Sequence, residues 1–308
     1  MSNVLVTGGA GFIGSNIVGL LVEGDHEVTV LDNLQSGYRS NLAPFPRVSL
    51  LEEDVRDAEA VNRAVSRAEV VFHLAASVGN VRSIEHPIED SEINIIGTLR
   101  VLEAARRAGV PKVVLSSSAA IFGEPKTLPV HEDHPAEPDS PYGASKLAAE
   151  KLCLAYSKLY GIQVVSLRYF NVYGINQRWD DYGNVIPIFA HRIVRNLPVV
   201  VFGDGEQTRD FVNVRDVARA NIEAAFNGAQ GAFNIASGGR ITVNRLAELM
   251  VELSGAEATI EHCAPRKGDV RHILGDISAA RAAFGYEPTV GLEEGLAEYM
   301  AWARKEIV

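Results

Sequence analysis

A tyrosine and a lysine four residues apart are the first pair in this sequence that could do chemistry. Tyr142 and Lys146 fall in the helix-like stretch 141–160, so both side chains lie on one face of the predicted helix. An ammonium group beside a phenol favours the phenolate and lowers the pKa of the phenol. The pair therefore predicts a general base that works near neutral pH. A solvent-exposed pair has the same spacing, and the spacing alone leaves that alternative open.

Three serines lie upstream of this pair. Residues 116–118 directly follow the apolar run 113–115, which is typical of a buried strand. Ligands on parallel sheets bind at the carboxyl ends of the strands, so Ser118 is expected at the ligand-binding edge. A polar turn is the alternative reading.

A glycine-rich turn opens the chain. The run Thr7–Gly14 reads TGGAGFIG and stands between an apolar strand and the start of a helix. Glycines at 8, 11 and 14 permit a tight turn, a close approach of a pyrophosphate, and close packing of the helix on the sheet. The helix N-terminus adds amide donors and partial positive charge. This context predicts a dinucleotide site formed by Gly8, Gly11 and Gly14; a turn without a ligand is the alternative.

An acidic residue ends the second predicted strand. Asp32 is placed to accept hydrogen bonds from the adenosine ribose, and its charge repels a 2′-phosphate, so NAD is favoured over NADP. The nearby Arg39 is a cation that suits a 2′-phosphate, so NADP stays as the alternative cofactor. Asp54 and Val55, after the third strand, are candidates for the adenine edge. The other cofactor contacts that we expect lie at the glycine turn and the strand ends: Phe12, Ile13, Asn33, Leu74, Ala75 and Ala76.

The elements that would position these residues alternate between strands and helices. This order predicts an α/β fold, a Rossmann-like doubly wound parallel sheet with helices on both faces and a smaller α/β substrate-binding lobe. The predicted strands are 4–6, 27–31, 48–51, 70–74, 112–116 and 163–168. The predicted helices are 13–23, 58–66, 89–108 and 141–160.

The pattern changes after residue 168, where glycine and proline are scattered and the elements are shorter. We expect an NAD-binding domain over 1–168 and a smaller substrate-binding lobe over 169–308. The two are expected to interleave, with a strand at 231–236 or a helix at 243–253 returning to the main sheet. The long stretches 89–108 and 141–160 cover the sheet or also pair two copies in a homodimer.

Composition limits the possible partners. The chain has 308 residues, 29 Lys+Arg against 39 Asp+Glu, and a formal charge of −10. This balance argues against general binding of nucleic acid or an anionic membrane. Two cysteines without metal-ligand spacing favour a reducing cytoplasm and no metal site. No basic, apolar leader and no long apolar run is visible, so we expect no membrane association.

Several motifs together resemble one family. The turn TGGAGFIG, the serines 116–118, YGASK at 142–146, RYFNVYG at 168–174 and GDGEQTRDFVNVRDV at 203–217 are similar to the extended short-chain dehydrogenase/reductase family. The resemblance covers nearly the whole chain and is strongest to nucleotide-sugar 4-epimerases of the UDP-galactose 4-epimerase type.

The resemblance implies roles for the three candidate catalytic residues. Tyr142 takes the proton from the sugar 4-hydroxyl while hydride passes from C4 to NAD. Lys146 holds the nicotinamide ribose and tunes Tyr142, and Ser118 bonds the sugar O4. The 4-keto sugar turns over, hydride returns to its other face, and NAD is regenerated.

One departure separates this chain from sibling enzymes. The 4,6-dehydratases carry Asp-Glu just after the serine or threonine position, and the UDP-glucuronate decarboxylases carry a Glu in the second place. Here these positions are Ala119 and Ala120. A methyl group cannot transfer the proton that elimination of water needs. Decarboxylation and other net redox chemistry stay as the alternative, with a non-catalytic NAD-binding regulator behind them.

The resemblance also implies a UDP-sugar pocket. Its expected residues are Ser118, Asn171, Asn184, Val185, Arg192, Val200, Phe202, Arg209, Arg266 and Asp269. Arginine suits the diphosphate because its guanidinium grips two oxygens. If Arg192 faces the sugar, it would pair with a C6 carboxylate, and Arg82 is a second candidate for a substrate anion. We therefore expect UDP-glucuronate slightly ahead of UDP-glucose. Ile273 stands where a bulky tyrosine in some relatives limits the pocket to unmodified hexoses.

Overall fold

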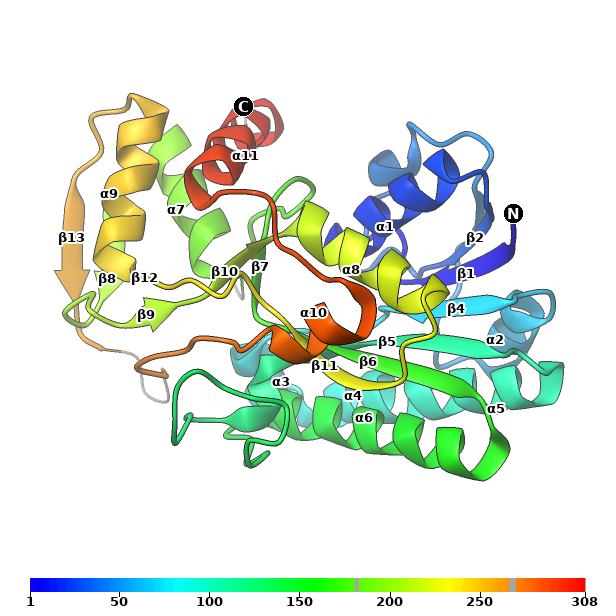
Figure 1. Cartoon of the computed structure of the whole chain (residues 1–308). Coiled ribbons are helices and arrows are strands. Elements are labelled where there is room, and N and C mark those ends of the chain that lie inside the picture. The colour runs from blue at the N-terminus through cyan, green and yellow to red at the C-terminus, as the bar shows by residue number, and fades with distance from the viewer. Residues whose placement is uncertain (181–182, 266–269, 308) are drawn as a thin grey trace.

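A seven-stranded parallel sheet forms the centre of the molecule. The protein is represented by a computed structural model, which describes residues 1–180, 183–265 and 270–307. The strands run in the order β3-β2-β1-β4-β5-β6-β11 (Figure 1). Their bounds are β1 (Asn3–Thr7), β2 (Glu27–Leu31), β3 (Ser49–Leu51), β4 (Val70–His73), β5 (Lys112–Ser118), β6 (Gln163–Tyr169) and β11 (Gly231–Ile235). This order confirms the predicted doubly wound fold, because the strand order reverses at β1.

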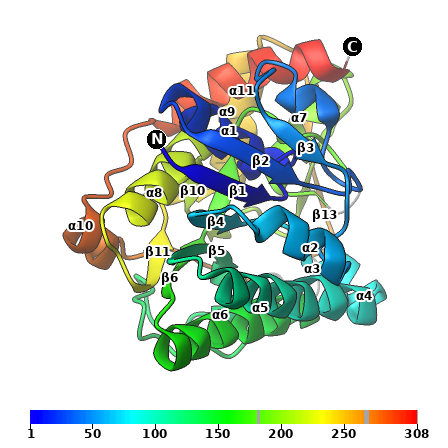
Figure 2. The ribbon, with the colours of Figure 1, turned by 90° about the vertical axis from the view of Figure 1, so that its right-hand side faces the viewer.

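Helices cover both faces of this sheet. On one face lie α1 (Phe12–Glu23) and α8 (Val214–Phe226), which pack against each other. On the other lie α2 (Ala58–Val65), α5 (Thr98–Ala108) and α6 (Pro141–Tyr160) (Figure 2). Each side has its own apolar core, and the central strands read as nearly continuous apolar runs because both of their faces are buried.

One predicted helix changes its hydrogen-bond pattern partway along. The stretch expected as a single helix over 89–108 consists of α4 (Pro87–Ser91), a π-helical segment, η2 (Glu92–Gly97), and then α5. A short helix that the sequence did not indicate, α3 (Asn80–Glu85), precedes them. Asn94, inside the π segment, directs its side chain to Ser77 and Asp90 instead of to solvent. Such π segments are frequent at functional sites, and this one lies beside the start of α6.

A smaller lobe stands at the carboxyl ends of the strands. It contains three two-stranded sheets: β7 (Asn171–Tyr173) with β10 (Phe211–Asn213), β9 (Thr208–Arg209) with β12 (Ile241–Thr242), and β8 (Val199–Phe202) with β13 (Ile260–Cys263). Three helices, α7 (Val185–Val194), α9 (Val243–Ser254) and α11 (Leu292–Ile307), share a separate apolar core with β8. The short segments η1 (Arg39–Leu42), η3 (Ala119–Phe122) and α10 (Ser278–Phe284) complete the described elements.

The chain crosses between the two lobes. Strand β11 pairs in parallel with β6, so the segment expected at 231–236 does return to the main sheet. Helix α8 returns as well and packs on α1. In contrast, the helix expected at 243–253 is α9, which belongs to the core of the smaller lobe. A division at residue 168 stays a prediction. Among the described residues, no helix has the length and apolar character needed to cross a bilayer.

Candidate active site

A strand end and a helix start meet at the candidate catalytic residues. Ser118 is the last residue of β5, and its Oγ accepts a hydrogen bond from the Ala120 amide at 3.1 Å. Helix α6 begins at Pro141, and Ser140 caps it by accepting from the Gly143 amide. A Cβ added to Gly143 would lie 2.4 Å from the Ala120 carbonyl oxygen. Only glycine therefore lets α6 start this close to the residues that follow Ser118.

This close approach brings Tyr142 to Ser118. The Ser118 hydroxyl lies near enough to the phenol to lower the pKa of Tyr142. Burial has the larger effect and raises the pKa of Tyr142 to about 12, and the charge of Asp90 raises it as well. The sequence expectation that Lys146 would lower this pKa is not met in the protein alone, because desolvation outweighs the favourable contacts.

Lys146 lies one turn further along α6 and is buried, with 4% of its surface exposed. Burial lowers the pKa of its ammonium group to about 8, while the charges of Asp90, Cys153 and Glu150 raise it. At neutral pH the lysine is therefore mainly protonated, and a small change in its surroundings moves it across the physiological range.

A buried polar cluster that sequence reasoning missed lies directly behind these residues. Ser145 donates to Asp90 Oδ2 at 2.5 Å, and Asn94 Nδ2 donates to Asp90 Oδ1 at 3.1 Å. Asn94 also donates to Ser145 Oγ at 3.0 Å and exchanges two hydrogen bonds with the backbone of Ser77. Ser145 stands within the YGASK motif, which was the one available signal. Asp90 and Asn94 carried none, because the π segment that turns them inward is not visible as a pattern.

The glycine turn has the geometry of a dinucleotide site. Gly8 has a φ of +70°, and a Cβ on it would lie 2.7 Å from the Ala75 amide nitrogen. A Cβ on Gly14 would lie 2.2 Å from the Gly8 carbonyl oxygen. Gly11 is the N-cap of α1 and supplies no side-chain cap, so the helix end presents backbone amides. An anionic pyrophosphate fits such an end, since the amides and the helix dipole both favour negative charge.

The strand ends next to the glycine turn hold the other expected cofactor residues. Asp32 accepts from the amides of Ala10 and Leu34 at 2.9 Å each, so its carboxylate also braces the glycine turn. Burial raises the pKa of Asp32. The Ala75 amide donates to Thr7 Oγ1 at 3.2 Å, which ties the segment after β4 to β1. Phe12, Ile13, Leu74 and Ala76 are half-buried around the same turn.

The side chain of Asp54, an expected adenine contact, is already hydrogen-bonded within the chain. Asp54 accepts from Arg56 Nε at 3.0 Å and from Nη2 at 2.9 Å, and Asn33 Nδ2 donates to it at 2.7 Å. The bond with Arg56 lowers the pKa of Asp54 to about 2. Val55 is buried against Gly97. The Asp54 side chain thus fixes the loop after β3, and its carbonyl accepts from the Asp57 amide at 2.9 Å.

The expected nucleotide-sugar residues lie on several elements of the smaller lobe. Asn171 starts β7 and donates through Nδ2 to the Asp210 carbonyl at 3.1 Å. Arg209 ends β9, two residues before β10, which pairs with β7. Asn184 is the N-cap of α7 and Val185 its first residue, while Val200 and Phe202 lie on β8. Arg266 and Asp269 lie outside the described residues.

The two arginines proposed for a sugar carboxylate have protein partners. Arg192 donates through Nε to the carbonyl of Pro198, which closes the turn between α7 and β8. Arg82 lies 3.7 Å from an oxygen of Asp180. The structural basis for a uronate preference at Arg192 is therefore removed. Ile273 is 8% exposed, belongs to the main apolar core, and donates its amide to the Thr208 carbonyl.

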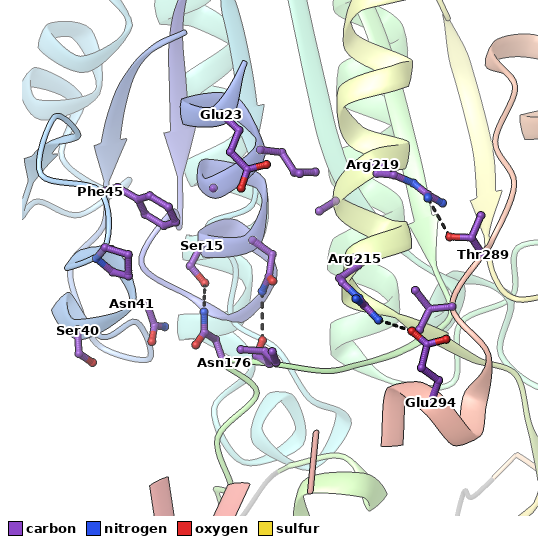
Figure 3. Close-up of a pocket in the computed structure, with 17 residues that line it drawn as sticks. Ser15, Glu23, Ser40, Asn41, Phe45, Asn176, Arg215, Arg219, Thr289 and Glu294 are labelled. Carbon is purple, nitrogen blue, oxygen red and sulfur yellow. Dashed lines mark hydrogen bonds and ion pairs between the residues drawn. The ribbon is translucent and has the colours of Figure 1, made fainter. Parts of the chain in front are cut away.

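A separate groove of about 600 Å³ runs between α1 and α8 (Figure 3). Its lining does not include Ser118, Tyr142 or Lys146. Asn176 donates to Ser15 Oγ at 3.0 Å on its floor, which fastens the loop after β7 to α1. The two arginines of its wall, at positions 215 and 219, pair with Glu294 and Asp216. The contacts at its walls thus connect α1 to the loop after β7, and α8 to α11 of the smaller lobe.

Comparison with known proteins agrees with this geometry. Residues 4–236 match the model of the NAD dependent epimerase/dehydratase family. The crystal structure of a UDP-glucose 4-epimerase with UDP-glucose from Thermotoga maritima is 42% identical, with a TM-score of 0.96, and the match covers 99% of this chain and 100% of that one. A UDP-N-acetylglucosamine 4-epimerase from Methanobrevibacter ruminantium, in complex with UDP-N-acetylmuramic acid, is 36% identical with a TM-score of 0.95 over 99% of both chains. The Thermus thermophilus UDP-glucose 4-epimerase in complex with NAD is 40% identical, with a TM-score of 0.91 over 98% of this chain and 99% of that one.

Proposed function

The chain belongs to the NAD-dependent epimerase/dehydratase family, and we propose that it interconverts UDP-glucose and UDP-galactose by inversion at C4, with NAD held at the glycine turn. The observation that carries this proposal is the close approach of the start of α6 to the end of β5, which brings Tyr142 beside Ser118 with the buried Lys146 one helical turn away. NAD, when bound, supplies a hydride acceptor that takes the C4 hydrogen and returns it.

The chain's own residues manage the proton. Tyr142 takes the proton of the sugar 4-hydroxyl on its phenolic oxygen and gives it back after the 4-keto sugar has turned over. Ser118 bonds the same sugar oxygen and relays the proton. The ammonium of Lys146 stabilises the phenolate electrostatically and hydrogen-bonds the nicotinamide ribose. Because burial holds the phenol near pKa 12, nearby positive charge is needed to bring the base into the working range.

The residues after Ser118 favour epimerisation over the alternatives of the same fold. Ala119 and Ala120 begin η3, and their methyl groups have no proton to give. Elimination of water needs an acid at this place, so we rank dehydration and decarboxylation below epimerisation. The chain retains Ser118, Tyr142 and Lys146, which a non-catalytic NAD sensor would not need.

Glucose is proposed as the sugar because the earlier argument for a uronate has lost its support. Arg192 is used at the α7–β8 turn, and the compared proteins are named for UDP-glucose and UDP-N-acetylglucosamine. Ile273 is smaller than the tyrosine of some relatives, so the N-acetylated sugar belongs in the assay.

The test is incubation of the purified protein, without added NAD, with UDP-glucose, UDP-N-acetylglucosamine and UDP-glucuronate in separate reactions. Products are resolved by NMR. We expect UDP-galactose from UDP-glucose and no accumulation of NADH. Formation of UDP-galacturonate alone would restore UDP-glucuronate as the proposed substrate. Release of carbon dioxide or of a 4-keto-6-deoxy sugar would overturn the proposal of a 4-epimerase.

Tyr142→Phe checks the proposed base. General acid–base catalysis contributes roughly 100- to 10,000-fold, so we expect a loss of at least about 100-fold in kcat with NAD still bound. Tyr160→Phe is the matched control, because Tyr160 ends the same helix and is 50% exposed. Near-normal turnover of Tyr142→Phe would remove this residue as the base.

We also propose a cytoplasmic homodimer. Helices α5 and α6 lie side by side at one end of the molecule (Figure 2). Ile96, Leu159 and Tyr160 leave 42%, 72% and 50% of their surface exposed on or next to these helices. A second copy that packs the same surfaces would cover them. Sedimentation velocity tests the dimer, and a monomer across the micromolar range would exclude it.

The proposed cytoplasmic location rests on the two cysteines. Both are free thiols, which suits a reducing compartment. Fractionation of the source cells tests this location.

A further inference from the structure

Asp90 is a buried carboxylate that the proposed mechanism does not use. It lies in α4 with 1% of its surface exposed. Its two oxygens accept from Ser145 and Asn94, which are neutral donors. Within the described ranges, no arginine or lysine is recorded as a hydrogen-bond or ion-pair partner of Asp90. A buried carboxylate with only neutral donors is costly, because desolvation penalises the charge.

The location of Asp90 relates this cost to the reaction. Its partner Ser145 precedes Lys146 in α6 and also donates to the Tyr142 carbonyl at 3.0 Å. The negative charge of Asp90 acts on both members of the catalytic pair and raises the pKa of Tyr142 and of Lys146. Asp90 is thus bonded to the residue next to Lys146, and its charge acts on the ammonium group of that lysine.

The other titratable groups around Lys146 do not supply that counter-charge. Glu150, on the same helix, is bound by Arg168 of β6 through two nitrogen atoms, at 3.0 and 2.7 Å. Burial lowers the pKa of His73, on β4, to about 3 and raises that of Cys153 to about 12, so both are neutral at pH 7. Tyr142 is itself protonated in the protein alone.

We propose that Asp90 is an electrostatic positioning residue whose carboxylate balances the Lys146 ammonium and so sets the pH range in which the Tyr142–Lys146 pair works. Asn94 and Ser145 hold this carboxylate in place, and the π segment is what turns Asn94 towards it. The inference rests on the proposed function for its kinetic readout only, because the charge balance is a property of the folded chain.

The sign of the effect makes the proposal specific. A nearby negative charge favours the protonated form of both a phenol and an ammonium group. Removal of that charge therefore lowers the pKa of Tyr142 and of Lys146 together. A bell-shaped pH profile of kcat, limited on its acid side by Tyr142 and on its alkaline side by Lys146, should move as a whole to lower pH. A purely structural role would lower kcat without moving either limb.

The test compares holoenzyme variants over a pH series. Asp90→Asn keeps the shape and removes the charge, and we expect both limbs to shift down by about one pH unit, which is a tenfold change in proton affinity. Ser145→Ala removes a hydrogen bond and keeps the charge, so its limbs should stay in place. An unmoved profile in Asp90→Asn, or an equal shift in Ser145→Ala, would overturn the proposal.

A second readout separates this proposal from the proposed function. The ultraviolet tyrosinate band, taken as the difference between each protein and its Tyr142→Phe form, reports the titration of Tyr142 without turnover. We expect this titration to move to lower pH in Asp90→Asn even if the substrate assignment is wrong. If Asp90→Asn does not fold, Asp90→Ser is a second neutral variant, and an unchanged Tyr142 titration in it refutes the proposal.

Discussion

Replacement of Arg168 by methionine tests the buried ion pair that joins α6 to the sheet. Arg168 donates from Nε and Nη2 to both oxygens of Glu150, and from Nη1 to the Glu132 carbonyl at 2.7 Å. Ser117 Oγ donates to the same carboxylate at 2.8 Å. The side chains of Arg168 and Glu150 are 7% and 0% exposed. Arg168→Met leaves Glu150 buried with Ser117 as its remaining donor.

The expected loss is about 3–5 kcal/mol in the free energy of unfolding, the typical effect of leaving one buried charge without its partner. Against a total of roughly 5–15 kcal/mol this is a large fraction. The double variant Glu150→Met/Arg168→Met removes both charges, and we expect it to be within about 1–2 kcal/mol of the parent, because two apolar side chains of similar length fill the space. Urea unfolding followed by far-ultraviolet circular dichroism measures both values.

The pH dependence of the single variant adds a second check. In Arg168→Met the charged form of a buried carboxylate without a cationic partner is disfavoured, so the cost of the substitution falls as pH drops. The deficit of Arg168→Met should therefore be smaller at pH 5 than at pH 7. The reasoning is refuted if Arg168→Met unfolds within about 1 kcal/mol of the parent, or if the double variant is less stable than Arg168→Met.

Two further predictions concern the NAD-binding half. Gly14→Ala should abolish NAD retention, measured as bound cofactor after gel filtration, because its Cβ would lie 2.2 Å from the Gly8 carbonyl oxygen. Gly19→Ala on the same helix is the control, since its Cβ would meet only the Phe45 ring at 3.2 Å. Retained NAD in Gly14→Ala would contradict this account of the turn. His73 is neutral between Thr7 and Thr98, with its pKa lowered to about 3 by burial, so the unfolded chain binds a proton below pH 6.5 that the folded chain does not. Stability should fall by up to about 1.4 kcal/mol per pH unit from this residue as pH drops from 6.5 towards 3, and His73→Gln should reduce that slope in urea titrations; an identical slope would assign the acid sensitivity to other groups.

Much of the fold was predictable from the sequence because its signals are local. Apolar runs such as β4 are buried on both faces, and the glycine turn marks the end of β1 and the start of α1. All six strands predicted in the first half are present, with ends that differ by at most two residues. The π segment within the helix expected over 89–108 escaped prediction, because the bonds of Asn94 to Ser77 and Ser145 span 17 and 51 residues.

The same distinction between local and long-range signals applies to the residues of the candidate site. Tyr142, Lys146 and Ser118 were predicted from spacing and motif, and the structure places the Ser118 hydroxyl near enough to Tyr142 to lower the pKa of its phenol. The direction of the pKa of Tyr142 was not predictable, since it depends on burial, which a helical spacing does not report. The bond of Arg192 to the Pro198 carbonyl was not predictable for a related reason, because it depends on how the turn after α7 folds back.

The buried charges explain why the base can be both desolvated and usable. Lys146 and Asp90 cancel, as do Arg168 and Glu150, so the protonated Tyr142 stands in a neutral surrounding. A phenolate alone would add an uncompensated negative charge, which burial opposes, and this is why the pKa of Tyr142 is high in the protein alone. Oxidised nicotinamide would supply one positive charge beside Tyr142, and ionisation of Tyr142 would then restore neutrality. Transfer of the sugar proton to Tyr142 would remove the phenolate charge as the cofactor became neutral. The site therefore stays neutral in both states, and Asp90 is the residue without which that balance fails.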